Sequence, residues 1–102
     1  MIRFLVQYPT PNDVEAFERH YNEVHLPLAK SLPGLRSYCV GRNVSAVRGE
    51  AFYLVAELEW DDLASLKRDF ASPLGRECSQ DVDRLAALCP GIRSVIYQPE
   101  PV

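Results

Sequence analysis

The residue best suited to proton-transfer chemistry is His25, within the stretch DVEAFERHYNEVHLPLAK. An imidazole titrates near pH ~6.5, so it can accept or give a proton at neutral pH without a special environment. His25 follows Phe17 and Tyr21 at steps of four and precedes Pro27 by two residues. Two interpretations are open. His25 either transfers protons at the rim of a cleft between helix and sheet, or caps a helix C-terminus, where its cation is favourable.

The other histidine and the cysteines are weaker candidates for chemistry. His20 points away from the apolar stripe of the same helix and is predicted to be exposed. His20 and His25 are five residues apart and do not share a face of an α-helix, which argues against a metal-binding pair. The cysteines are three in number and have no C-x-x-C spacing, so neither a disulfide framework nor a zinc site is expected. Cys39 and Cys78 are predicted to be small buried apolar residues.

The acidic residues Glu57 and Glu59 alternate with apolar residues along one predicted strand. We expect them to pair with Arg3, Arg36 or Arg42, since only their proximity to each other suggests an acid/base pair. The sequence contains no glycine-rich phosphate loop and no nucleophile elbow, so a nucleotide cofactor is not expected.

Length and composition predict one soluble globular domain spanning residues 1–102. The chain is 47% hydrophobic and 25% charged, with a formal net charge of −3. This charge argues against nucleic acid as a partner, because phosphates bind to basic surfaces. No apolar run approaches the ~20 residues of a membrane span, and the N-terminus lacks the features of a signal peptide. A cytoplasmic location and no membrane partner are therefore expected.

Hydrophobic periodicity predicts four strands and two interrupted helices. The first helix is expected to begin at Asn12 or Asp13 and to kink or stop at Pro27, which cannot donate a backbone hydrogen bond. A second helix is expected to begin at Asp61 or Asp62 and to restart at Ser72-Pro73. The strands are predicted over residues 2–8, 35–44, 51–60 and 92–97.

This β-α-β-β-α-β order predicts a ferredoxin-like α+β sandwich, with a four-stranded antiparallel sheet and both helices on one face. The alternating residues from Phe52 to Trp60 should face the helices. The opposite face would then expose Leu5, Tyr53 and Val55, together with Val40 or Tyr38 and Val95 or Tyr97. Because an apolar patch of this size is unusual on a monomer, we expect a second copy to cover it, forming a homodimeric α+β barrel. The alternative is that Arg3, Gln7, Glu57 and Glu59 keep this face hydrated and the protein monomeric.

The sequence resembles the EthD domain family of dimeric α+β barrel proteins over nearly its whole length. The most specific shared element is a helix with Phe, Tyr and His four residues apart, followed by Pro-Leu. The residues that carry the resemblance are Tyr8-Pro9, Pro11, Phe17, Tyr21, His25, Pro27-Leu28, Leu32-Pro33-Gly34-Leu35 and Tyr38, together with the stretch from Tyr53 to Glu77.

The resemblance implies a small hydrophobic or aromatic metabolite held between helices and sheet, with no cofactor. Chemistry of the lyase, isomerase, cyclase or monooxygenase type would use His25 as the acid or base. Haem-degrading relatives use a histidine on the later helix, and this chain has none after His25. A non-catalytic ligand-binding or structural dimer is the alternative. The candidate ligand-binding residues are Phe4, Val6, Tyr21, Leu28, Tyr38 and Trp60.

Overall fold

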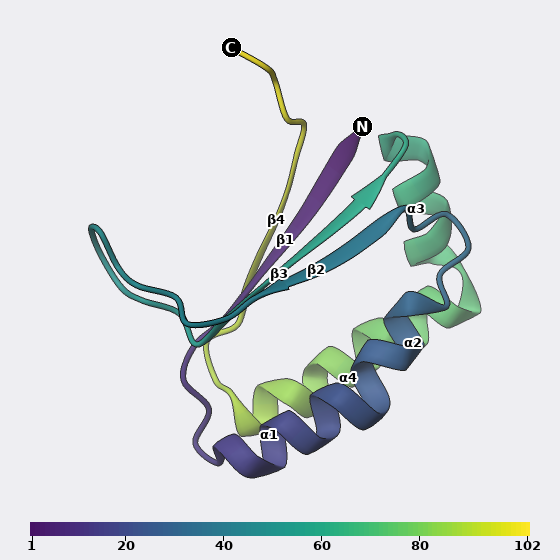
Figure 1. Ribbon diagram of the computed structural model, residues 1–102. Helices are drawn as coiled ribbons and strands as arrows, with labels where there is room; N and C mark the ends of the chain where they lie inside the picture. Colours follow the sequence, from purple (N-terminus) through teal and green to yellow (C-terminus); the bar gives the residue numbers. More distant parts are fainter.

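The computed structural model describes residues 1–102 and confirms the predicted element order. Figure 1 shows a single sheet with all the helices on one side of it. The elements in chain order are β1 (Ile2–Tyr8), α1 (Val14–His20), the π-helical turn η1 (Tyr21–His25), α2 (Leu26–Lys30), β2 (Ser37–Gly41), β3 (Leu54–Trp60), α3 (Leu63–Ala71), α4 (Pro73–Leu88) and β4 (Arg93–Tyr97).

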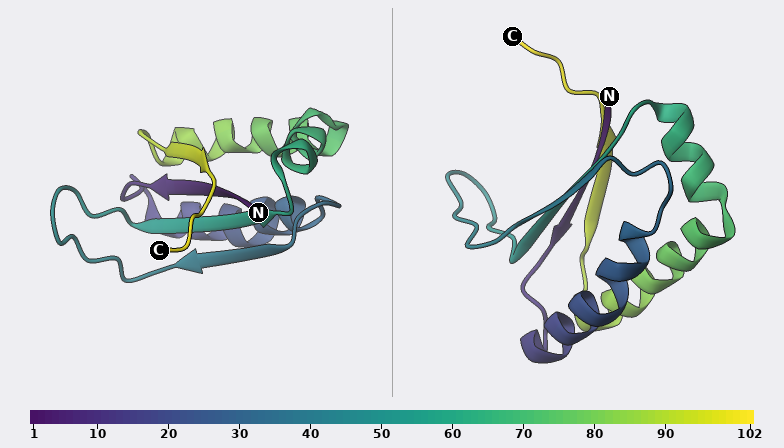
Figure 2. Two further views of the ribbon diagram at one scale, coloured as in Figure 1. Left: turned by 90° about the horizontal axis from the view of Figure 1, so that it is seen from above. Right: turned by 45° about the vertical axis from the view of Figure 1, so that its right-hand side comes forward.

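The sheet has the strand order β2-β3-β1-β4, and every neighbouring pair is antiparallel. It is therefore the predicted ferredoxin-like sheet, with one face covered by helices and the other open (Figure 2). The helices begin where side chains accept hydrogen bonds from otherwise unpaired backbone amides. Asp13 accepts from Ala16 at 3.0 Å, and Asp62 accepts from Ser65 at 2.8 Å.

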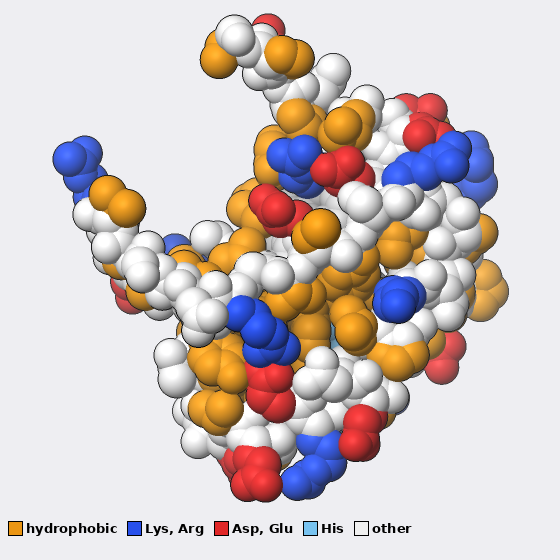
Figure 3. Space-filling model, in the orientation of Figure 1, with side chains coloured by type: hydrophobic (Ala, Val, Ile, Leu, Met, Phe, Trp, Pro, Cys, Tyr) orange, Lys and Arg blue, Asp and Glu red, His pale blue; other side chains and the backbone are white.

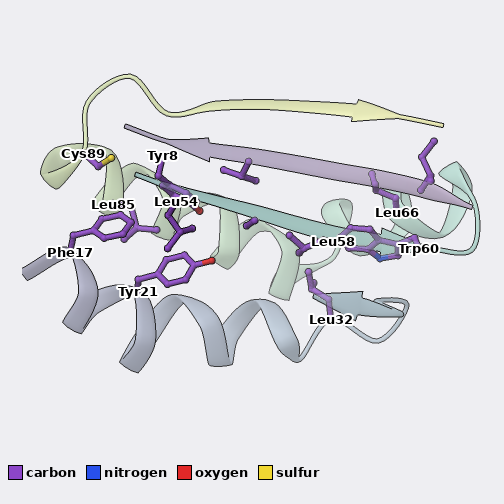
Figure 4. Close-up of a cluster of buried hydrophobic side chains, with 13 residues drawn as sticks. Tyr8, Phe17, Tyr21, Leu32, Leu54, Leu58, Trp60, Leu66, Leu85 and Cys89 are labelled. Atoms are coloured by element: carbon purple, nitrogen blue, oxygen red, sulfur yellow. The ribbon is translucent and has the colours of Figure 1, made fainter. Parts of the chain in front are cut away.

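Alternation along β3 places the predicted residues from Leu54 to Trp60 on the helix side. Phe52, predicted with them, lies before the strand and outside the core, beneath Arg93. In β3, Leu54, Ala56, Leu58 and Trp60 are all buried, as are Ile2, Val6 and Tyr8 of β1. Together with Phe17 and Tyr21 from the first helix and Leu85 from α4, they form the hydrophobic core (Figure 4). The apolar side of β3 thus meets the helices as its pattern predicted.

The register of β2 corrects the predicted composition of the open face. Tyr38 lies opposite Leu58, and Val40 lies opposite Ala56, so both point toward the helices. Cys39 therefore points the other way and is exposed, not buried as predicted. The uncertain alternation of this strand, in which polar and apolar residues occur on both faces, explains the error.

Tyr53 was also expected on the open face, and this was wrong. It precedes the first residue of β3, so strand alternation does not set its direction. Its ring packs edge-on against Phe17, with 6.0 Å between centroids, and its hydroxyl donates to Glu18 at 2.6 Å. Arg42 donates two hydrogen bonds to the same carboxylate, which ties both ends of the β2–β3 connection to α1.

That connection, residues 42–53, is longer than predicted because β2 and β3 are shorter than the runs 35–44 and 51–60. It extends from the body as an irregular arm (Figures 1 and 3), and Val47 within it is fully exposed. The C-terminal segment after β4 also leaves the body. None of the helices has the length and hydropathy that crossing a membrane requires.

Candidate functional site

A π-helical turn positions His25. The helix does not stop before Pro27. Instead, the amide of Leu26 donates to the carbonyl of Tyr21, five residues earlier, and Pro27 lies in the first turn of α2. A proline inside a helix removes one backbone hydrogen bond, and the wide turn directly before Pro27 is a distortion of the kind that accommodates such a break. Short π-helical turns are rare and occur frequently at functional sites.

This wide turn changes which side chains share a face. In an α-helix with 3.6 residues per turn, residues five apart are separated by about 140°, whereas i→i+5 bonding places them one above the other. His20 and His25 accordingly reach the same carboxylate, that of Asp81 on α4 (His20 Nε2–Oδ1 2.8 Å, His25 Nδ1–Oδ2 2.9 Å). The prediction of an exposed His20 was therefore wrong, because it assumed a regular α-helix.

Asp81 is fully buried and is the residue that sequence reasoning missed. Besides the two imidazoles, Arg84 donates to its Oδ1 at 3.1 Å. Burial of Asp81 acts to raise the pKa of its carboxyl, but the three donors outweigh this effect and the pKa lies below its usual range. The only signal in the sequence was the spacing of Asp81 and Arg84, an acidic residue three positions before a basic one on a helix. A solvent-exposed ion pair on a helix surface has the same spacing.

The ionised Asp81 fixes the tautomer of His25. Desolvation by burial lowers the pKa of His25, although the hydrogen bond that it donates to Asp81 opposes this, so the ring is neutral at neutral pH. A carboxylate only accepts hydrogen bonds, so Nδ1 carries the proton and Nε2 carries the lone pair. No buried polar side-chain atom of the structure lacks a partner. Because Nε2 has no protein partner, it is reached from the adjoining pocket.

The pocket lies between the helices and the sheet. About 510 Å³ of space, its open mouth included, is bounded mainly by apolar and aromatic side chains. Binding pockets for small ligands have this character, with a few polar groups that orient the ligand. The lining residues are Phe4, Val6, Tyr8, His25, Ala29, Leu32, Tyr38, Leu58, Trp60, Phe70, Gly75, Cys78, Ser79 and Val82.

Five predicted site residues meet at this pocket: His25, Phe4, Val6, Tyr38 and Trp60. Tyr21 does not line it. It lies fully buried behind Tyr38, and their hydroxyls are 2.7 Å apart. The ring of Tyr21 also stacks on His25, with 5.6 Å between centroids.

Leu28 was predicted to line the pocket and does not. The π-turn rotates the following residues, so Ala29, four residues after His25, faces inward and Leu28 is half-buried outside the lining. Val24, which lies within the wide turn, is 42% exposed. The inward-facing stripe is Phe17, Tyr21, His25 and Ala29.

A four-stranded antiparallel sheet with helices on one face and an apolar pocket between the layers defines a protein with a ferredoxin-like α+β sandwich fold. The chain belongs to the EthD family: the EthD domain model matches residues 10–88. A protein described as an uncharacterised 11.0 kDa protein in the thcB–thcC intergenic region of Rhodococcus erythropolis is 30% identical over 89 residues, 85% of each chain.

Solved structures agree with this assignment. An EthD family protein of Bacillus halodurans C-125 is similar with a TM-score of 0.86 and 30% identity, over 98% of this chain and 99% of that one. SnoaB of Streptomyces nogalater, a cofactor-independent oxygenase, shares the fold with a TM-score of 0.71 and 17% identity, over 99% and 94% of the two chains. A dimeric protein of Bacteroides fragilis shares it with a TM-score of 0.66 and 20% identity, over 95% and 94%.

Proposed function

We propose that this protein binds a small hydrophobic or aromatic metabolite between helices and sheet and catalyses proton transfer on it, without a cofactor, through His25. The main support for the proposal is that the His25 ring lies between the carboxylate of Asp81 and the pocket. Asp81 accepts the Nδ1 proton of His25, and the Nε2 lone pair is left open to an apolar cavity. A neutral imidazole held in this tautomer by a carboxylate is a general base.

The surroundings of His25 support this role over that of a helix cap. Its ring is only 6% exposed and lies in the middle of a continuous helix, not at a free C-terminus. General-base catalysis by a positioned side chain contributes typically about 10²–10⁴-fold to a rate. Similarity in fold to a cofactor-independent oxygenase is compatible with chemistry that uses protein side chains alone.

His25→Asn tests the proposal, because the asparagine amide can still donate to Asp81 while the Nε2 lone pair is removed. Purified protein is incubated with a library of aromatic metabolites, and conversion is followed by mass spectrometry. We expect a compound that wild type converts to be converted at least about 100-fold more slowly by His25→Asn, with binding affinity retained. Glu23→Gln, an exposed change in the same turn, is the control. Equal turnover by His25→Asn contradicts the proposal, and binding without turnover by wild type supports the non-catalytic alternative.

The open face of the sheet supports a homodimer as the working unit. Leu5 and Val55 lie on its two central strands, Val95 is 53% exposed at one side, and no element of the chain covers them. Arg3, Glu57 and Glu59 lie on the same face, so it is only partly apolar. Covering its apolar part with the same face of a second copy is the simplest symmetric solution. The Bacteroides fragilis protein of the same fold is described as dimeric.

We expect wild type to sediment as a dimer at micromolar concentration, and Val55→Glu to sediment as a monomer. The substitution places a charge on the apolar part of the open face, where two copies would bury like charges against each other. Val14→Glu, at an exposed position of α1, is the matched control and should leave the dimer intact. A monomeric wild type in sedimentation equilibrium would rule out the barrel.

A further inference from the structure

The pocket contains two polar atoms without a partner in the protein. One is Nε2 of His25, the lone-pair atom described above. The other is the hydroxyl of Tyr8, a residue that is 1% exposed and lines the pocket. Tyr8 makes no side-chain hydrogen bond, and since no buried polar atom is unsatisfied, its hydroxyl must also face the cavity. Burial raises the pKa of Tyr8, so it remains protonated and donates a hydrogen bond.

The pocket contains no charged side chain. None of its lining residues is Lys, Arg, Asp or Glu. Two buried carboxylates lie behind lining residues, Asp81 behind His25 and Asp69 behind Trp60, and Arg84 is already paired to Asp81. An anionic ligand would therefore lose its hydration without meeting a cation, which is costly in an apolar site. A neutral ligand meets no such penalty.

The other end of the pocket is aromatic. Phe70 packs edge-on against Phe4 and against Trp60, with centroid distances of 5.2 and 5.7 Å. The indole N–H of Trp60 donates to Asp69 at 2.8 Å, so the ring offers the pocket only carbon surface. Figure 4 shows Tyr8 and Trp60 toward opposite ends of the core, with Leu58 between them. Aromatic rings arranged in this way favour an aromatic ligand.

We propose that the pocket takes a neutral hydroxyaromatic compound, with its ring against Phe4, Phe70 and Trp60 and its hydroxyl between Tyr8 and His25. A phenolic oxygen accepts one hydrogen bond and donates one, so it satisfies a tyrosine donor and an imidazole acceptor together. This assignment rests on the proposed function and adds the substrate class to it. In this arrangement the hydroxyl proton of the ligand points at Nε2 of His25, the atom that would remove it in general-base catalysis.

Three probes with the same bicyclic ring separate the possibilities: 2-naphthol, naphthalene and 2-naphthoate. Binding is measured by isothermal titration calorimetry at pH 7.5, with wild type, Tyr8→Phe and Tyr97→Phe. We expect 2-naphthol to bind wild type about tenfold or more tightly than naphthalene, because two buried polar atoms become paired. We expect 2-naphthoate to bind more weakly than naphthalene.

Tyr8→Phe should lower the affinity for 2-naphthol about five- to tenfold and leave that for naphthalene unchanged. Tyr97→Phe, on the open face, should change neither.

The outcomes distinguish this assignment from the proposed function. If 2-naphthoate binds as tightly as 2-naphthol, or if Tyr8→Phe has no effect on 2-naphthol, the hydroxyaromatic class is wrong while an apolar binding pocket stands. If none of the three probes binds, both proposals are contradicted. Because the Tyr8 hydroxyl has no partner in the protein, Tyr8→Phe should keep the unfolding midpoint of wild type, and unfolding in urea verifies this.

Discussion

Replacing Asp81 by alanine should lower the free energy of unfolding by about 3 kcal/mol, the magnitude expected when one partner of a buried ionic network is removed. The carboxylate accepts hydrogen bonds from His20, His25 and Arg84, and its side chain is fully buried. Without it, the Nδ1 proton of His25 has no acceptor in an environment where water does not reach. Asp83→Asn, two residues along α4 and exposed, is the matched control and should change stability little.

The same network makes the stability of wild type depend on pH. His25 has a folded-state pKa below its ordinary 6.5, so its unfolded form takes up a proton first and stability falls as the pH drops below 6.5. Asp81 has a folded-state pKa below its ordinary 3.8, so a second loss follows below that pH. Urea unfolding of wild type between pH 7 and pH 3 should show both stages, and the second should be smaller in Asp81→Ala. Glu18, Asp61 and Asp62, whose pKa values are also lowered, account for the remainder. An unfolding free energy of Asp81→Ala equal to that of Asp83→Asn would disprove the anchoring role.

Gly75→Ala should also be strongly destabilising, by about 3 kcal/mol, the upper part of the range for overpacking a well-packed core. A Cβ at this position would stand 2.0 Å from the carbonyl oxygen of Asp69 and 2.7 Å from the Cα of Phe70. Both are backbone atoms of α3, so no side-chain rotation relieves the clash. The amide of Gly75 is also held at 3.0 Å from Ser72 Oγ, the cap of α4. The start of α4 would have to separate from α3.

Gly41→Ala is the control, since its new Cβ would find ordinary contacts, the nearest at 3.6 Å on the open face. We expect its urea midpoint to match that of wild type. Gly75 and Phe70 both line the pocket, so Gly75→Ala should also change the near-ultraviolet circular dichroism of Trp60, which packs on Phe70. A Gly75→Ala variant as stable as Gly41→Ala would mean that α3 and α4 do not approach this closely.

The fold was predictable because the local signals for strands, helix starts and breaks in the sequence are consistent with one another. The alternation of β3, the caps at Asp13 and Asp62, and the restart at Ser72-Pro73 are local signals, and they led to the correct element order. The register of β2 was not predictable in the same way. Its alternation is ambiguous, and only pairing with β3 places Tyr38 on the helix side.

The candidate site was predictable as far as His25 and part of its pocket. The role of Asp81 in holding His25 was not predictable. The contact joins residues 56 positions apart on two different helices, and no local sequence pattern specifies how these helices pack. The role of His20 depended on the π-turn, and hydrophobic periodicity assumes a constant helical pitch. The face of α4 that bears Asp81 could only be recognised once the partner helix was in place.

The turn at Tyr21–His25 acts as a single-residue insertion in a helix. Deleting one residue there would leave a regular α-helix in which the two histidines are four residues apart, about 40° around the helix axis. Both imidazoles would then still face the carboxylate on α4, and the flanking segments would keep their orientation. When related chains are aligned, a gap of one position at this turn is therefore expected to mark a regular helix that keeps the same site.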